Sequence, residues 1–339
     1  MKPPNSGFCL ITVAICFLAT MCITAYAGMA PEEVKAFEEL KIKAEKGDTF
    51  AEAMLGASYT YGQGVTKNMV EAAKWYRKAA EKGVAPSQYS LGICYDSGEG
   101  VEKDAVEAAR WYRKAAELRN VIAQVTLGDC YASGRGVGID KVEAVKWYRN
   151  AAEQGNMRAQ SNLGVCCEEG QGTKKDAVEA LKWFRKAAEQ GYAHAQSKLG
   201  VYYKNGKGVV KDASESVKWF KKAAEQGHAT AQANLGICFI SGEGVEKDPI
   251  EGVNWYRKAS DQGNSSAQAN LGSCYYFGEG VAKDEIEAYA YWNLAAITQE
   301  DTRKNLAIIE TTMSADVRLR GQQRTKELQK EIEAKKARK

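Results

Sequence analysis

The chain has 339 residues, of which 45% are hydrophobic and 27% are charged, and its formal net charge is +4. The hydrophobic fraction is ample for a core, and so small a net charge indicates neither nucleic acid nor a membrane surface as partner. The charge is uneven, because residues 318–339 carry nine Lys and Arg against three Glu. Such a tail can contact nucleic acid or anionic lipid, but a short terminal helix rich in Lys and Glu is more often solvated, as we expect here.

The first 27 residues have the pattern of a secretory signal peptide. Lys2 precedes a 16-residue hydrophobic run from Phe8 to Ile23, and the small residues Ala25 and Ala27 mark a cleavage site. We therefore predict cleavage after Ala27 and export to the bacterial periplasm or the extracellular space. An uncleaved inner-membrane anchor is the less favoured alternative, because a membrane span needs about 20 residues.

Residues 28–50 are predicted to form an N-terminal capping helix, and the chain then repeats one pattern seven times. Aligned on its opening small residue, the pattern starts again every 36 residues. A fixed period of this size is typical of a solenoid, in which each repeat packs against its neighbours. We place the repeats at residues 51–86, 87–122, 123–158, 159–194, 195–230, 231–266 and 267–300. In the C-terminal helical extension, residues 301–339, we expect Ser314 to cap a last helix that frays towards Lys339.

Each repeat is predicted to begin with a helix, named helix A here. In the sixth repeat Ala231, Leu235, Cys238 and Phe239 follow the 3.6-residue period of one helix face. We expect helix A to run from the opening small residue to just before the first loop glycine. A Leu-Gly pair recurs in all seven repeats. Glycine inside a helix costs about 1 kcal/mol relative to alanine, so this recurrence predicts the close approach of another helix.

A G-x-G loop is predicted to lead into a second helix, named helix B. The first glycine suits a left-handed helix cap and the second a tight reversal. The loop follows a helix and lacks the third glycine of a dinucleotide-binding fingerprint, so we interpret it as structural. Asp or Asn with Glu three residues later then predicts a capping box at the start of helix B. The core of helix B is expected to hold an aromatic column that contains Trp75, Trp111, Trp147, Trp183, Trp219, Trp255 and Trp292.

Six cysteines follow the predicted signal peptide: Cys94, Cys130, Cys166, Cys167, Cys238 and Cys274. Five of them occupy one position of helix A. Equivalent helices of packed repeats lie about 8–10 Å apart, whereas a disulfide needs Cα atoms within about 7 Å. We therefore expect buried thiols rather than disulfides within this column, and one of the adjacent Cys166 and Cys167 must point away from it.

The pattern A-x-x-x-L-G-x-x-Y-x-x-G-x-G-V-x-x-D-x-x-x-A-x-x-W-Y-x-K-A-A-E-x-G, kept nearly throughout from Ser87 to Glu117, resembles the Sel-one-like repeat. This relative of the tetratricopeptide repeat covers about Ala51 to Ala296. The resemblance implies an all-α, right-handed superhelical solenoid of αα-hairpins, with helix A on the concave face. It also implies an adaptor role, and several exported bacterial members act in envelope or host interactions. A cysteine-rich branch is linked to penicillin binding and β-lactam hydrolysis, but its paired cysteines stand at positions where this chain has none.

The residue types that catalytic and metal sites need are scarce. His194 and His228, the two histidines of the chain, are 34 residues apart and are expected to be exposed in turns between repeats. The sequence contains no Ser-x-x-Lys, G-x-S-x-G, C-x-x-C or H-E-x-x-H motif. We therefore predict no catalytic residue, no metal site and no cofactor.

Binding is expected on the surface of helix A that lies opposite its core positions. There the residues at positions 4, 7 and 11 of each repeat vary, and variation on a fixed scaffold is how solenoids build binding surfaces. The predicted binding residues are Ser90, Asp129, Asn162, Glu169, Lys198, Asn205, Asn234, Asn270 and Phe277. A column of Gln residues beside the core is expected to hydrogen-bond neighbouring backbone.

These observations predict a non-enzymatic scaffold that binds a protein or peptide in the cell envelope or the secreted space. Two alternatives stay open at this point. One is an envelope hydrolase of the β-lactamase-like branch, and the other is a factor that binds peptidoglycan or another cell-wall glycan without catalysis. No nucleic-acid partner is expected, and no membrane span after signal cleavage.

Overall fold

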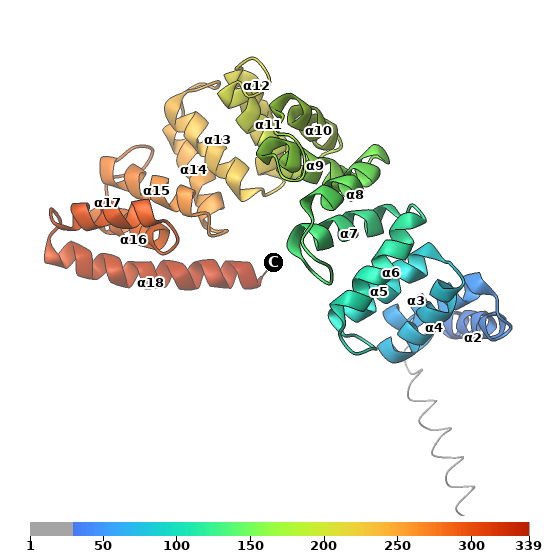
Figure 1. Ribbon diagram of the computed structural model, residues 1–339. Coiled ribbons are helices and arrows are strands. Elements are labelled where there is room, and N and C mark those ends of the chain that lie inside the picture. Colours follow the sequence, from blue (N-terminus) through green and yellow to red (C-terminus); the bar gives the residue numbers. More distant parts are fainter. Residues whose placement is uncertain (1–29, 339) are drawn as a thin grey trace, which may run out of the picture. The chain divides into compact units, whose positions relative to one another are not determined.

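The computed structural model describes residues 30–338, so the predicted signal peptide and the three cysteines within it lie outside the described residues. Residues 30–338 form seventeen α-helices and no strand. They divide into two compact units, an N-terminal unit that ends at Gln154 and a C-terminal unit that begins at Gly155. Figure 1 shows the first in blue to green and the second in green to red.

Both units are solenoids built from αα-hairpins, so the predicted all-α class is confirmed. The N-terminal unit begins with α2 (Pro31–Glu45). The helices A are α3 (Thr49–Tyr61), α5 (Ala85–Ser97), α7 (Val121–Ser133), α9 (Met157–Glu169), α11 (Ala193–Asn205), α13 (Ala229–Ser241) and α15 (Ser265–Phe277). The helices B are α4 (Met69–Glu81), α6 (Ala105–Glu117), α8 (Lys141–Glu153), α10 (Ala177–Glu189), α12 (Ala213–Glu225), α14 (Pro249–Ser260) and α16 (Glu285–Ala296).

Helix A begins two residues before the opening small residue, which corrects the predicted start. In five repeats a side chain three residues before that residue accepts a hydrogen bond from its N–H, as Asn156 does from Ala159 at 2.9 Å. This contact satisfies one of the N–H groups that the first helical turn leaves free. The capping residues are Asp48, Asn120, Asn156, His228 and Asn264.

The predicted cap of helix B forms, but only half of the capping box does. The Asp104 carboxylate accepts hydrogen bonds from the N–H groups of Val106 and Glu107, at 2.9 and 3.0 Å. The Asp104 N–H donates to the carbonyl of Tyr95 on helix A and not to the Glu107 side chain. Glu107 instead pairs with Arg110 on its own helix at 2.9 Å. The cap therefore joins the two helices of a hairpin.

The Leu-Gly glycine lies where helix A meets the second aromatic residue of helix B, as its recurrence predicted. A Cβ atom on Gly236 would stand 2.6 Å from the ring of Tyr256. The second loop glycine allows a similarly close approach between neighbouring repeats. A Cβ atom on Gly244 would stand 2.2 Å from the carbonyl oxygen of Ala213 in the preceding repeat. Any larger side chain would force these backbones apart.

The aromatic column is mostly core, with two exceptions and one shift of register. Five of the seven Trp side chains are buried, whereas Trp147 and Trp219 are half-buried. In the last repeat Trp292 packs against Gly272, where the other repeats place their second aromatic residue. The Trp position itself is taken there by Tyr291, which is half-buried.

The Gln column is confirmed as structural. Gln124 donates from Nε2 to the carbonyl of Ala116 at 3.1 Å, and its Oε1 accepts from Gln154 at 2.7 Å. The first of these bonds recurs at Gln88, Gln196 and Gln232. The second recurs between Gln190 and Gln160, Gln226 and Gln196, and Gln262 and Gln232. This ladder fixes neighbouring helices to one another inside each unit.

The cysteine column is buried as predicted at four of its five positions, and Cys166 is the exception. None of the six in residues 30–338 forms a disulfide, and five are buried. Cys166 is the half-buried member of the adjacent pair, while Cys167 is 2% exposed. Burial raises the pKa of the Cys94 and Cys274 thiols to about 11, so these groups are protonated at neutral pH.

The C-terminal extension is packed, and the expected fraying is wrong. After α17 (Glu300–Glu310), α18 (Ala315–Ala337) begins at the Ser314 cap, as predicted, and packs against α16. Leu328 and Ile332 are buried against α16. These contacts hold α18 along the end of the C-terminal unit (Figure 1).

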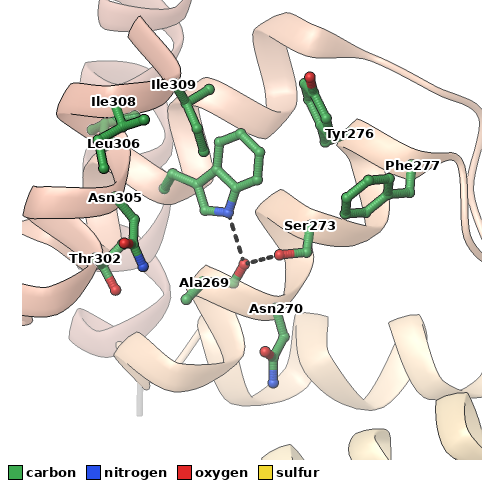
Figure 2. Close-up of a pocket in the computed structure, with 11 residues that line it drawn as sticks. Ala269, Asn270, Ser273, Tyr276, Phe277, Thr302, Asn305, Leu306, Ile308 and Ile309 are labelled. Carbon is green, nitrogen blue, oxygen red and sulfur yellow. Dashed lines mark hydrogen bonds between the residues drawn. The ribbon is translucent and has the colours of Figure 1, made fainter.

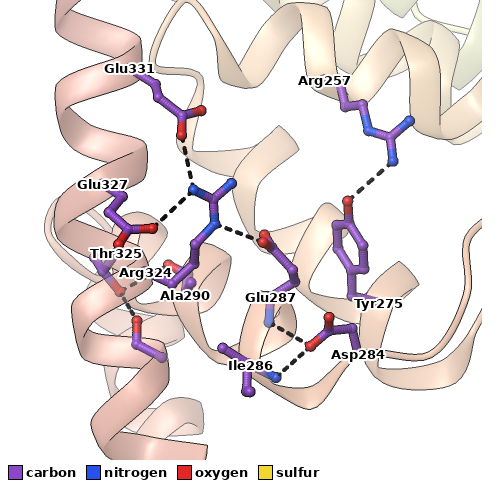
Figure 3. Close-up of polar contacts among 11 residues, drawn as sticks. Arg257, Tyr275, Asp284, Ile286, Glu287, Ala290, Arg324, Thr325, Glu327 and Glu331 are labelled. Atoms are coloured by element: carbon purple, nitrogen blue, oxygen red, sulfur yellow. Dashed lines mark hydrogen bonds and ion pairs between the residues drawn. The ribbon is translucent and has the colours of Figure 1, made fainter.

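Two basic residues of α18 form ion pairs with other elements. Figure 3 shows the Arg324 guanidinium between three carboxylates, at 2.7 Å from Glu287, 2.9 Å from Glu331 and 3.3 Å from Glu327. Near the helix end, Lys335 pairs with Asp261 at 2.7 Å. Arg324 and Lys335 therefore help to dock α18 against the rest of the C-terminal unit.

Candidate helix-A binding surface

The predicted binding residues of the N-terminal unit make contacts within that unit. Ser90 is half-buried and hydrogen-bonds the hydroxyl of Tyr76. Asp129 is half-buried and accepts a hydrogen bond from the Tyr148 hydroxyl at 2.8 Å. Both side chains hold neighbouring helices together, so they offer less to a partner than their sequence variation indicated.

Lys198, the one predicted cation of the surface, belongs to an ion-pair cluster. Glu168 accepts from Lys198 and from Lys207, both at 2.7 Å, and joins the fourth repeat to the fifth. Burial opposes the charge of Glu168, but the hydrogen bonds and attraction of the two lysines lower its pKa. Lys198 is therefore a structural residue as well as a surface residue.

The remaining predicted residues lie along helices A of the C-terminal unit. Asn162 and Asn234 are half-buried, and the Asn234 amide donates to the carbonyl of Thr230 in its own helix at 2.9 Å. Glu169 and Asn205 are exposed at the ends of α9 and α11, and Glu169 accepts from Gln171. The side chains at the loop end of helix A are thus the most accessible.

A cavity of about 510 Å³ lies where α15 meets α16 and α17. Its lining includes Asn270 and Phe277, which the sequence predicted, together with Ser273 from the same variable stripe. Figure 2 shows these residues of α15 together with Thr302, Asn305, Leu306, Ile308 and Ile309, which line the cavity from α17. The structure therefore brings α17 and α15, the last helix A, together at a single site, named the α15–α17 pocket here.

The α15–α17 pocket is apolar with a few polar groups. The indole of Trp292 is part of its lining, and the Trp292 N–H donates to the Ala269 carbonyl at 3.1 Å. The same carbonyl accepts from the Ser273 hydroxyl at 3.2 Å. Phe277 and Ile308 are 74% and 68% exposed, so two large apolar side chains stand open to solvent beside it. Exposed apolar groups next to a pocket are typical of an interaction site.

The two histidines are neither exposed nor far apart, which corrects the prediction. Both are half-buried in the C-terminal unit, and their ring centroids are 6.0 Å apart. His194 lies in the first turn of α11, where its Nδ1 is 2.9 Å from the Ser161 hydroxyl. Burial lowers the pKa of both rings, and the positive charge of Lys198 adds to this effect at His194. Ser161 is completely buried, so its side chain is closed to solvent in this pair.

Residues 30–338 contain no group of three or more His, Cys, Asp or Glu side chains that could hold a metal ion. None of the helices in this part of the chain is long and apolar enough to cross a membrane.

The repeat itself decides the family. Seven consecutive segments match the model of the Sel1 repeat, at residues 49–84, 85–120, 121–156, 158–192, 193–228, 229–264 and 265–297. The chain belongs to the Sel1-repeat family. Repeats of this kind typically mediate protein interactions and are generally non-catalytic, so the fold indicates a protein-binding adaptor.

Two solved structures of Sel1-repeat proteins are similar to this chain. One is c5321 of uropathogenic Escherichia coli, a protective antigen with an SLR fold, which is 33% identical. The match covers 90% of this chain and 74% of that chain, with a TM-score of 0.61. The other, a Sel1-repeat protein from Oxalobacter formigenes, is 34% identical over 72% of this chain and 96% of that chain, with a TM-score of 0.66. No curated protein matches the chain.

Proposed function

We propose that this Sel1-repeat protein is a non-enzymatic adaptor that binds a peptide segment of a partner protein along helices A of its C-terminal unit. An apolar side chain of the partner would occupy the α15–α17 pocket. The observation that carries this proposal is the cavity of about 510 Å³ between α15, α16 and α17, with Phe277 and Ile308 exposed beside it. Ligand pockets usually measure about 300–1,000 Å³ and combine an apolar lining with a few polar groups.

Polar side chains that line the pocket can hydrogen-bond the backbone of a bound peptide segment. Asn270 and Asn305 are part of the lining, and each carries an amide that can donate to a carbonyl and accept from an N–H. Asn234 lies on α13 and Asn205 on α11 of the same unit. In this proposal, the predicted binding residues of the C-terminal unit contact the partner on either side of its anchor.

We also propose that the protein works outside the cytoplasm, in the envelope or the secreted space. Residues 1–27 support this with their hydrophobic run and small-x-small site. A similar Sel1-repeat protein is described as a protective antigen, which agrees with an exported location. Sequencing the N-terminus of the protein purified from its native cells should find Gly28 first, and an intact Met1 would contradict cleavage.

The binding proposal is tested by replacing the two exposed apolar residues at the pocket. A partner is first captured from the native envelope with the wild-type chain, and its dissociation constant is then measured. F277S/I308S should weaken binding by at least about tenfold, because buried apolar anchors carry much of an interface's energy. V210S is the matched control, since Val210 is 85% exposed on the loop after α11, away from the pocket lining. Equal affinity of F277S/I308S and the wild type would contradict the proposed site.

A further inference from the structure

A lysine covers the tryptophan of helix B in five of the seven repeats. It stands three residues after the Trp, and its ammonium nitrogen lies 3.7–4.4 Å from the centroid of the indole. A cation over an aromatic face is attracted by the negative charge density of the ring. The pairs are Trp75 and Lys78, Trp111 and Lys114, Trp183 and Lys186, Trp219 and Lys222, and Trp255 and Lys258.

The third repeat lacks this lysine and has a cavity in its place. Asn150 stands three residues after Trp147, and no Lys or Arg of residues 30–154 lies over the Trp147 ring. A cavity of about 360 Å³ is lined there by Trp147, Asn150, Gln124 and Gln154. Trp147 is half-buried, but so is Trp219 beneath Lys222, so the open cavity rather than the exposure of the indole distinguishes the third repeat. The short Asn side chain thus leaves open a space that lysine fills in the sibling repeats.

The charges around this cavity favour a cation. Its lining contains the carboxylates of Glu117 and Glu153, both on exposed residues, and one positive group, Arg119. Neither carboxylate has an ion-pair partner among the described residues. Arg119 stands where five other repeats have glycine, with a φ of 64°. The net charge of the lining is therefore −1.

We propose that this cavity, named the Trp147 pocket, binds the ammonium head group of a ligand on the indole face that lysine covers in the sibling repeats. The head group belongs either to a lysine side chain of a partner or to a free alkylamine. Both present the same compact charge on an alkyl chain, and Glu117 and Glu153 neutralise that charge. The site lies in the N-terminal unit, so it does not depend on the peptide site proposed for the C-terminal unit.

The experiment is a titration of the full chain followed by the indole N–H signals of an NMR spectrum, with the Trp147 signal assigned from W147F. One arm uses n-butylammonium and its uncharged analogue 1-butanol. The other uses N-acetyl-lysine methylamide and the norleucine analogue, which has the same backbone without the ammonium. We expect saturable shifts of the Trp147 signal with at least one cation and not with its neutral match. The arm that responds identifies the source of the head group.

Two substitutions make the test specific. N150K restores the covering lysine and should reduce the affinity for the cation by at least about tenfold, with an unchanged circular dichroism spectrum. K114N in the N150K background opens the same space over Trp111 and should move the response to the Trp111 signal. R119G removes the competing charge and should tighten binding. Shifts that neutral and charged probes cause equally, or binding that N150K leaves intact, would overturn the proposal.

Discussion

Gln88 shows how much one side chain contributes to the hydrogen-bond ladder. Its Oε1 is buried and has no hydrogen-bond partner among the described residues. In four other repeats this oxygen accepts from a Gln thirty residues later, but here that position is Leu118. An unsatisfied buried acceptor is costly, and a hydrogen bond that satisfies it contributes about 1 kcal/mol.

L118Q should therefore stabilise the protein by about 0.5–1.5 kcal/mol. Leu118 is 53% exposed, so little apolar burial is lost in the exchange. The free energy of unfolding in urea measures the effect. L118A is the control, because it removes the leucine without adding a donor. Equal stability of the L118Q and L118A proteins would show that the ladder bond contributes nothing at this position.

The histidine pair predicts how stability depends on pH. Burial lowers the pKa of His194 and His228 in the folded protein below the ordinary value of about 6.5. At pH below about 6.5 the unfolded chain binds more protons than the folded one, so stability falls as pH falls until the lowered folded pKa is reached. Lys198 and the mutual repulsion of the two rings oppose protonation at His194, while Glu168 favours it.

The wild type should thus unfold at a lower urea concentration at pH 5.5 than at pH 7.5. H194Q/H228N should lose much of this difference, since Gln and Asn do not titrate in this range. Asn also keeps the cap of α13, as Asn264 does for α15. If the unfolding midpoint of the variant shifts between pH 5.5 and pH 7.5 as much as that of the wild type, groups other than these histidines cause the pH dependence.

At the scale of the element, α18 is the part whose role changes most between sequence and structure. Most of its residues are polar or charged, and only one narrow face of the helix is buried. The residues of this face are Gly321, Thr325, Leu328 and Ile332. The spacing of these four residues is that of one helix face, so the packing against α16 was readable from the sequence. The ion pair of Arg324 with Glu287 was not, because Glu287 is 37 residues earlier and lies in a different element.

L328A should loosen α18 from the C-terminal unit. Leu328 is 4% exposed, and removal of a buried leucine side chain costs about 2–5 kcal/mol. The result expected is earlier cleavage within residues 315–337 in limited proteolysis and a lower thermal midpoint. L319A on the same helix is the matched control, since Leu319 is 68% exposed. If both variants are cleaved at the wild-type rate, α18 is not held by this contact.

At the scale of the whole molecule, the period of 36 residues predicted nearly all of the architecture. It gave the hairpins, the loop glycines, the helix-B caps and the core columns, because each of these features recurs at one position. His194 and His228 differ by nearly one period, so neighbouring hairpins bring them together.

The period says little where the chain departs from it. Thr302, Asn305 and Ile308 line the α15–α17 pocket from α17, a helix without an equivalent in the repeats. The repeat pattern therefore predicted Asn270 and Phe277 but not the lining residues of α17. The helix-A caps were missed for a similar reason, since Val84 and Tyr192 stand at that position in two repeats and do not cap with their side chains. In the proposal for the Trp147 pocket, a single departure, Asn150, likewise makes one repeat differ from the others.

The most direct test of the adaptor account is hydrogen–deuterium exchange of the full chain with and without its captured partner. The account predicts slower exchange in α13, α15 and α17, with the largest change at the loop end of α15 and in α17. F277S/I308S should abolish this protection. Protection confined to helices B, or to the N-terminal unit alone, would contradict a binding surface made by helices A of the C-terminal unit.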